Sequence, residues 1–139
     1  MKLVLDTNVL VAAFVAHGAC SDLLEHAIHH HEVVWSRPLI SELRDVLRRK
    51  FQQRDTDVRQ ALALLTARFT LVAAVALAMP VCRDPDDDAV LATALTGGCA
   101  AIVTGDQDLL ILDPFMGVRV LTPAAFWPWE AGPEALNPH

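Results

Sequence analysis

Short apolar runs alternate with longer segments in which apolar residues recur at helical spacing. The short runs contain few polar residues and are rich in Val, Ile and Leu, which is typical of strands covered on both faces. These predicted strands span residues 2–5, 32–35, 100–103 and 118–121. The predicted helices span residues 9–15, 21–31, 38–47, 58–69 and 89–95, with a shorter one at 109–112. Residues 71–72 fit either a short strand or a buried loop.

This alternation predicts the fold class. Strands joined by helices form right-handed crossovers, which give a mainly parallel sheet with helices on its faces. The 139 residues are 53% hydrophobic, enough for the core of one domain. We therefore expect an α/β protein with a single domain over residues 1–127, followed by a loosely ordered tail over 128–139, where Gly, Pro and Asn become frequent.

Charge and hydropathy narrow the classes of function. Eleven basic and seventeen acidic residues give a net charge of −6, the wrong sign for holding nucleic acid by electrostatics alone. A polyphosphate ligand would need bridging cations. The dense basic cluster Arg48, Arg49 and Lys50 fits either a solvated helix end or a grip on phosphates. We expect a cytoplasmic protein without a signal peptide or membrane span, because the apolar runs are too short.

Polar residues follow two of the predicted strands directly. Asp6 and Asn8 come after the first strand, and Thr104, Asp106 and Asp108 come after the strand at 100–103. In open α/β sheets, ligands bind outside the carboxyl ends of the strands. Asp6 and Asp106 could also be ordinary helix caps. The three consecutive histidines at 29–31 point in different directions from a helix end, so a metal site there is not expected.

An acidic run precedes the helix at 89–95. Four carboxylates in residues 84–88 repel one another unless they spread into water or converge on a cation. Asp84 can cap the helix and Pro85 fits its first turn. Glu42, on the helix at 38–47, lies beside the apolar stripe, where it could pair with nearby arginines or reach the same sheet edge.

A parallel sheet brings these acids together. Asp6, Glu42, Asp88 and Asp106 can meet at the carboxyl edge although they are far apart in sequence. Carboxylates without Cys or His ligands suit Mg²⁺ or Mn²⁺, which engage substrate phosphates. The sequence therefore predicts metal-dependent phosphoryl chemistry. A phosphatase that uses an aspartate after the first strand is disfavoured, because it requires a second aspartate where this chain has Asn8.

Four segments together resemble the PIN-domain family, and more narrowly the toxin components of bacterial toxin–antitoxin pairs. The resemblance extends over about residues 2–126. The segments that carry it are Asp6-Thr7-Asn8-Val9-Leu10-Val11, the Pro38-Leu39-x-x-Glu42-Leu43 segment, Arg83-Asp84-Pro85-Asp86-Asp87-Asp88, and Val103-Thr104-Gly105-Asp106-x-Asp108. The resemblance implies a Rossmann-like α/β/α sandwich and a metal-dependent ribonuclease that acts on RNA. It also implies a homodimer and inhibition by an antitoxin protein.

The resemblance also assigns roles to individual residues. It implies that Asp6, Glu42, Asp88 and Asp106 bind the metal, with Asn8 and Thr104 in support. Asp88 is chosen because Asp88-Ala89-x-Leu91-Ala92 fits the family's helix start. Whether Asp84, Asp86 or Asp87 joins it stays open, and Asp108 could also approach the metal. The alternative is a non-catalytic module in which the acids bind a cation and a basic protein partner.

Overall fold

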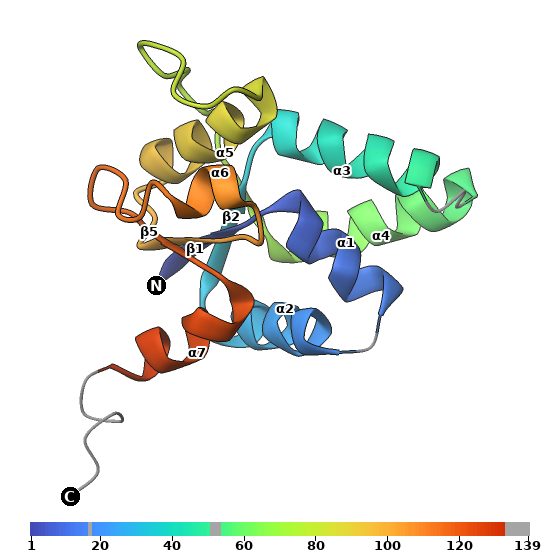
Figure 1. Cartoon of the computed structure of the whole chain (residues 1–139). Coiled ribbons are helices and arrows are strands. Elements are labelled where there is room, and N and C mark those ends of the chain that lie inside the picture. The colour runs from blue at the N-terminus through green and yellow to red at the C-terminus, as the bar shows by residue number, and fades with distance from the viewer. Residues whose placement is uncertain (17, 51–53, 133–139) are drawn as a thin grey trace, which may run out of the picture.

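A five-stranded parallel sheet forms the centre of the protein. The computed structural model describes residues 1–16, 18–50 and 54–132. The strands are β1 (Lys2–Leu5), β2 (Glu32–Trp35), β3 (Thr70–Leu71), β4 (Ala101–Val103) and β5 (Arg119–Leu121). Their order across the sheet is β3-β2-β1-β4-β5, and every neighbouring pair is parallel. β1 therefore lies in the middle, with β4 as a direct neighbour (Figure 1).

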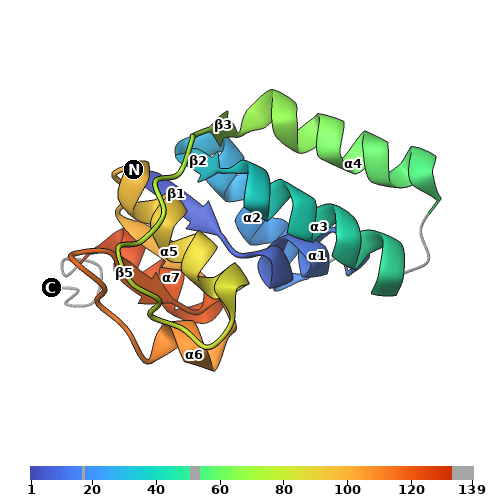
Figure 2. The ribbon, with the colours of Figure 1, turned by 90° about the horizontal axis from the view of Figure 1, so that it is seen from above.

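Helices surround this sheet in two layers. They are α1 (Thr7–Val15), α2 (Ala19–His30), α3 (Arg37–Lys50), α4 (Asp55–Arg68), α5 (Pro85–Thr96), α6 (Gln107–Leu110) and α7 (Pro123–Ala131). α5 packs over β1, β2 and β4 on one face, and α2 and α7 lie on the opposite face (Figure 1). α3 and α4 run side by side and project beyond the sheet in both views (Figures 1 and 2). This arrangement confirms the predicted α/β/α sandwich with a parallel sheet.

The apolar strand runs form the core, as their composition predicts. Leu3, Val4, Ile102 and Val103 have no exposed surface, and the strand β2 is buried from Val33 onward. Leu43 and Leu47 of α3 and Leu91 of α5 pack into the same core without exposure. Burial of a Leu or Val side chain contributes about 1.5–3 kcal/mol, so these residues fix the positions of the strands and of the helices that follow them.

Several sequence-based expectations are decided or corrected by the structure. The sequence allows either a short strand or a loop at residues 71–72, and in the structure Leu71 lies in a strand of two residues that pairs with β2. α1 begins at Thr7 with Asp6 as its cap, two residues before the predicted start at residue 9. α7 extends to Ala131, so residues 128–131 are helical although we assigned them to a loose tail. Pro123 occupies the first turn of α7 and Thr122 caps it, which starts the helix before the apolar Trp127-Pro128-Trp129 segment.

Within the described residues, no single helix is long and apolar enough to cross a membrane. α1 and α2 pass that test only as a bent pair, by length and composition.

Candidate metal centre at the carboxyl edge of the sheet

Asp6 directly follows the central strand β1 and is 4% exposed. Its backbone N–H donates to the carbonyl oxygen of Val103 at 2.9 Å, which continues the pairing of β1 with β4. Its side chain accepts hydrogen bonds from the backbone N–H of Thr7 and the hydroxyl of Thr104, both at 2.7 Å. The central strand and two hydrogen bonds therefore hold this carboxylate in one orientation.

Thr104 joins Asp6 to the turn that follows β4. Its hydroxyl donates to Asp6 and accepts from the backbone N–H of Asp106 at 3.0 Å. Asp106 in turn caps α6 by accepting from the backbone N–H of Asp108 at 2.9 Å. Because Thr104 has no exposed surface, this chain of hydrogen bonds fixes the distance between the two predicted ligand residues Asp6 and Asp106.

The acidic run starts α5, but its carboxylates point in different directions. Asp84 caps the helix by accepting from the backbone N–H of Asp86 at 2.9 Å. Asp87 is 8% exposed, and one of its carboxylate oxygens lies within 4.8 Å of oxygens from both Asp106 and Asp108. Asp88 instead accepts from the backbone N–H groups of Val81 and Cys82, at 3.2 and 2.8 Å. The structure thus brings Asp87 into the acidic cluster and turns Asp88, our choice from sequence, toward the preceding loop.

Glu42 faces the same cluster from α3. Burial is the main cause that raises its pKa to about 7, followed by the charges of Asp86, Asp6 and Asp84, while a hydrogen bond with the Thr7 side chain opposes the shift. Among the described residues, no ion pair links Glu42 to an arginine. The pairing with neighbouring basic residues that helix geometry allowed is therefore not observed, and Glu42 lies with the acids.

The convergence of these carboxylates perturbs their titration. Burial, then Asp106 through a hydrogen bond and its charge, raise the pKa of Asp87 to about 7. Burial also raises the pKa of Asp6, with a further increase from Asp106, against the opposing hydrogen bonds of Thr104 and Thr7. Like charges held this close disfavour the ionised forms, and a cation removes the penalty. The donor set is all oxygen, which fits Mg²⁺ or Mn²⁺ and not a thiolate- or imidazole-binding ion.

Arg83 lies next to the acidic cluster, although it was not among the predicted site residues. Its guanidinium binds both carboxylate oxygens of Asp108, at 2.8 and 3.0 Å, while its side chain stays 85% exposed. This contact and the charge of Asp108 raise the pKa of Arg83 further above its ordinary value. The only signal for it in the sequence was its position directly before the acidic run.

The remaining predicted site residues lie outside the cluster. Asn8 is exposed in the first turn of α1. Arg48 forms an exposed ion pair with Asp55 at 3.3 Å, and Arg49 contacts the carbonyl oxygen of Asp45 at 3.5 Å. The side chain of Lys50 lies outside the described part of the chain. Because a helix rises 1.5 Å per residue, Arg49 is about 10 Å further along α3 than Glu42.

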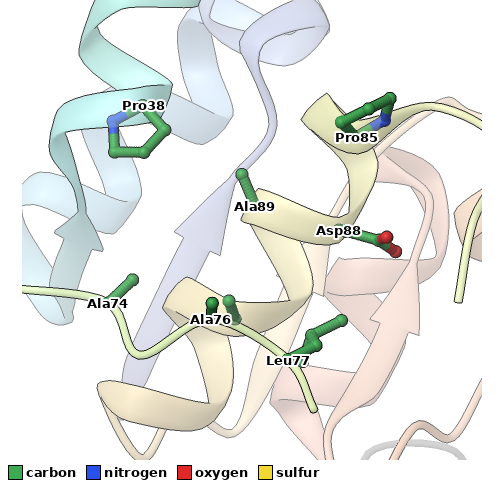
Figure 3. A pocket seen from close by; sticks show the side chains of 8 residues that line it. Pro38, Ala74, Ala76, Leu77, Pro85, Asp88 and Ala89 are labelled. Carbon is green, nitrogen blue, oxygen red and sulfur yellow. The ribbon is translucent and has the colours of Figure 1, made fainter. Parts of the chain in front are cut away.

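A small apolar pocket adjoins the acidic cluster along α5. It has a volume of about 250 Å³ and is lined mainly by small side chains of α5, the start of α3 and the 74–77 segment (Figure 3). Asp88 is its one acidic lining residue, and the carboxylate of Asp88 is already hydrogen-bonded to the 81–82 backbone. The pocket is therefore distinct from the acidic cluster, although both share the first turns of α5.

Comparison with solved structures shows the same fold in several toxin–antitoxin proteins. VapBC2 from Rickettsia felis, bound to a DNA fragment from its promoter, is 14% identical with a TM-score of 0.62, over 86% of this chain and 97% of that one. VapBC-1 from nontypeable Haemophilus influenzae is 14% identical with a TM-score of 0.63, over 89% and 99%. A toxin–antitoxin complex from Klebsiella pneumoniae is 21% identical with a TM-score of 0.60, over 87% and 97%.

Comparison with family models gives a direct assignment. Residues 2–108 match the model of the PIN domain, which includes all the carboxylates of the acidic cluster. A comparison with curated proteins finds no significant match. The matched region is more than half of the chain, and the chain belongs to the PIN domain family.

Proposed function

We propose that this protein is a Mg²⁺- or Mn²⁺-dependent ribonuclease and the toxin of a toxin–antitoxin pair. The observation that carries the proposal is a convergence of carboxylates. Those of Asp87, Asp106 and Asp108 have oxygens within 4.8 Å of one another, and the charge of Asp106 raises the pKa of Asp6 while that of Asp6 raises the pKa of Glu42. Carboxylates that lie this close repel one another when ionised. Such a cluster suits a site that binds cations together with substrate phosphate.

Some residues of the site would bind the cation, and others keep the ligand side chains in position. Asp6, Asp87 and Asp106 would bind it, with Glu42 and Asp108 at the margin of the site. When bound, Mg²⁺ or Mn²⁺ activates water and neutralises phosphate charge. Thr104 holds Asp6 and Asp106 in register through its hydroxyl. Ionised Asp87 would bind the cation and ionised Glu42 would add its charge beside it, so both side chains would lose their protons as the site fills.

Asp88 has a positioning role in this proposal. Its carboxylate fixes the backbone at Val81 and Cys82, next to Arg83. Arg83 is highly exposed and bound to Asp108, so it is placed to exchange that partner for a substrate phosphate. Arg48 and Arg49 offer a second, more distant phosphate contact along α3, which lets RNA follow the helix away from the acids.

The partners follow from the same proposal. The solved toxin–antitoxin proteins share the fold, and we infer that an antitoxin protein binds and inhibits this chain. We also propose a homodimer that works in the cytoplasm. Exposed apolar side chains suited to such contacts include Val75 and Met79, which are 72% and 74% exposed, and Trp127, which is 37% exposed.

The test is cleavage of a mixed RNA pool by purified protein with Mg²⁺ or Mn²⁺, and with a chelator. We expect Asp6→Asn and Asp87→Asn to lose about a hundredfold or more in rate. Asp88→Asn should keep most of the activity, because its oxygen still accepts a hydrogen bond. Asp22→Asn is the matched control, since Asp22 is an exposed acid in the first turn of α2.

Other outcomes are equally informative. Cleavage that persists in both Asp6→Asn and Asp87→Asn would point to a contaminating nuclease and contradict the shared site. Loss of activity in Asp88→Asn but not in Asp87→Asn would return the ligand role to Asp88. Calorimetric binding of Mg²⁺ without any cleavage would favour the non-catalytic module that binds a cation and a basic partner.

A further inference from the structure

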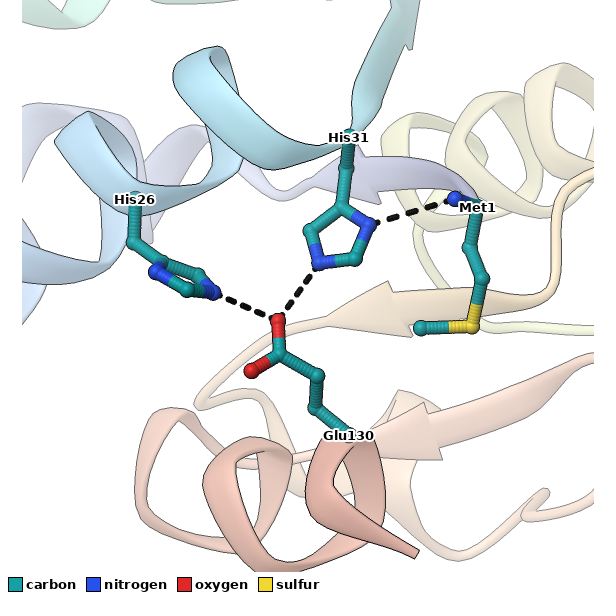
Figure 4. A network of polar contacts seen from close by, with 4 residues as sticks. All are labelled: Met1, His26, His31 and Glu130. Atoms are coloured by element: carbon teal, nitrogen blue, oxygen red, sulfur yellow. Dashed lines mark hydrogen bonds and ion pairs between the residues drawn. The ribbon is translucent and has the colours of Figure 1, made fainter.

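A second group of metal-ligating side chains lies on the other side of the sheet. Nε2 of His26 and Nε2 of His31 both lie 2.5 Å from the same carboxylate oxygen of Glu130 (Figure 4). His26 belongs to α2, His31 directly follows that helix, and Glu130 belongs to α7. The side chain of His31 is 9% exposed, and those of His26 and Glu130 are 26% and 22% exposed.

From this geometry we propose a Zn²⁺ site formed by His26, His31 and Glu130. Two imidazoles and one carboxylate are a ligand set that Zn²⁺ binds with three protein ligands and one open position. Metal–ligand distances of about 2.0–2.1 Å separate tetrahedral ligand atoms by about 3.3 Å. The carboxylate oxygen of Glu130 must therefore withdraw by roughly 0.8 Å, a small movement for a side chain at a helix end.

Imidazole ligands separate this site chemically from the acidic cluster. Mg²⁺ and Mn²⁺ prefer the all-oxygen cluster, whereas Zn²⁺ and Co²⁺ bind imidazole nitrogen well. The surroundings are also different, because the ring of Phe126 lies 6.0 Å from that of His31 and the ring of Trp127 lies 4.8 Å from that of His26. The sequence did not predict this site. Only His31 belongs to the histidine triplet, and its partners are five and ninety-nine residues away.

The surrounding contacts indicate what zinc would do. The site links α2 to α7, and the backbone nitrogen of Met1, directly before β1, lies 3.2 Å from Nδ1 of His31. If Nε2 of His31 binds zinc, the ring hydrogen must lie on Nδ1. The Met1 nitrogen is an ammonium group that can only donate, so it would no longer find an acceptor at Nδ1 and this contact must rearrange on binding. Bound zinc would clip α7 onto the face of the sheet opposite α5. This link between two elements of the fold does not depend on the proposed nuclease activity.

The experiment measures Zn²⁺ binding to the untagged protein by calorimetry in excess Mg²⁺, with Co²⁺ absorption spectra as a second readout. We expect one equivalent of Zn²⁺ to bind and to change the tryptophan fluorescence. Zn²⁺ at a hundred times its dissociation constant should raise the folding constant about a hundredfold. His31→Gln and His26→Gln should weaken Zn²⁺ binding by more than the roughly 10–100-fold that loss of an outer contact costs.

Glutamine makes these variants diagnostic. Its amide N–H still donates to Glu130, so an interaction that is only a hydrogen-bonded network survives while metal binding is lost. His29→Gln, an exposed neighbour outside the site, and Asp106→Asn, in the acidic cluster, should both keep zinc binding. Unfolding of each variant without metal shows whether it is folded. Absence of Zn²⁺ binding to the wild type, or zinc binding that His31→Gln keeps and Asp106→Asn removes, would overturn the proposal.

Discussion

The raised pKa of Glu42 predicts that the metal-free protein loses stability between pH 5 and pH 8. The ordinary pKa of this side chain is 4.5, and in the fold it rises to about 7. Above pH 4.5 the unfolded chain releases this proton before the folded protein does, so the free energy of unfolding falls as the pH rises. The fall is complete above pH 7. Below pH 4.5 Glu42 is protonated in both the folded and the unfolded chain, so it adds nothing to the pH dependence of the free energy of unfolding.

The size of the effect follows from the same values. A change from 4.5 to 7 corresponds to about 3 kcal/mol if the charge were fully shielded from solvent. Glu42 is partly exposed, so screening by water reduces this to about 1 kcal/mol. For a chain of this size, that free energy lowers the melting temperature by about 3–5 °C.

The assay is urea denaturation at pH 5 and pH 8 with a chelator present, for the wild type and for Glu42→Gln. Glutamine keeps a side-chain partner for Thr7 but does not titrate. The wild type should lose about 1 kcal/mol more than the variant between the two pH values, and excess Mg²⁺ at pH 8 should reverse much of that difference. Equal losses in the two proteins would refute the conclusion that Glu42 ionises against the acids of this site.

Three further substitutions test other parts of the argument. Thr104→Val should lower the free energy of unfolding by about 1–3 kcal/mol, because it leaves a buried oxygen of Asp6 without its hydrogen-bond donor. Calorimetry should show that the Mg²⁺ affinity of this variant falls about tenfold or more. Thr104→Ser keeps the hydroxyl and should keep both the stability and the affinity. Leu43→Ala should cost about 2–5 kcal/mol in urea denaturation, because Leu43 is fully buried in the core, and a smaller loss would mean that the core closes around the gap. Asp113→Asn should cost about 1 kcal/mol at pH 7, because Arg119 lowers the pKa of Asp113. That difference should vanish as the pH falls through the lowered pKa, and a difference that persists in acid would contradict an ionic origin.

Strands β1, β2 and β4 could be predicted because nearly all of their side chains are buried, on both faces of the sheet. Val33, Val34 and Trp35 are only 1–2% exposed, and such runs leave little ambiguity in sequence. β3 could not be decided, because its two residues are exposed and belong to the sheet only through pairing with β2. α7 was not among the predicted helices. Thr122 and Pro123 are residues typical of a helix start, but Pro128 within the helix and Gly132 directly after it disfavour a helix that extends to Ala131.

The choice between Asp87 and Asp88 shows where the sequence reaches its limit. Successive residues on a helix point about 100° apart, so the rotation of α5 decides which carboxylate enters the site. The residues three, four and seven positions after Asp87 are Val90, Leu91 and Ala94. Each of them is at most 1% exposed, which places Asp87 on the buried face of the helix. The same test applied to Asp88 finds apolar residues too, because small and apolar side chains surround almost the whole helix. Only packing against the sheet fixes the rotation.

An aspartate of this cluster can cap a helix and still serve as a metal ligand. Asp6, Asp84 and Asp106 each cap a helix, and the charges of all three contribute to the raised pKa of Asp87. A cap occupies one lone pair of a carboxylate oxygen with a backbone N–H, and the carboxylate has further lone pairs for a cation. The capping bond fixes the side chain before any cation arrives, so less conformational freedom is lost on binding. The capping bonds at the helix starts would therefore preorganise the proposed site at the carboxyl edge of the sheet.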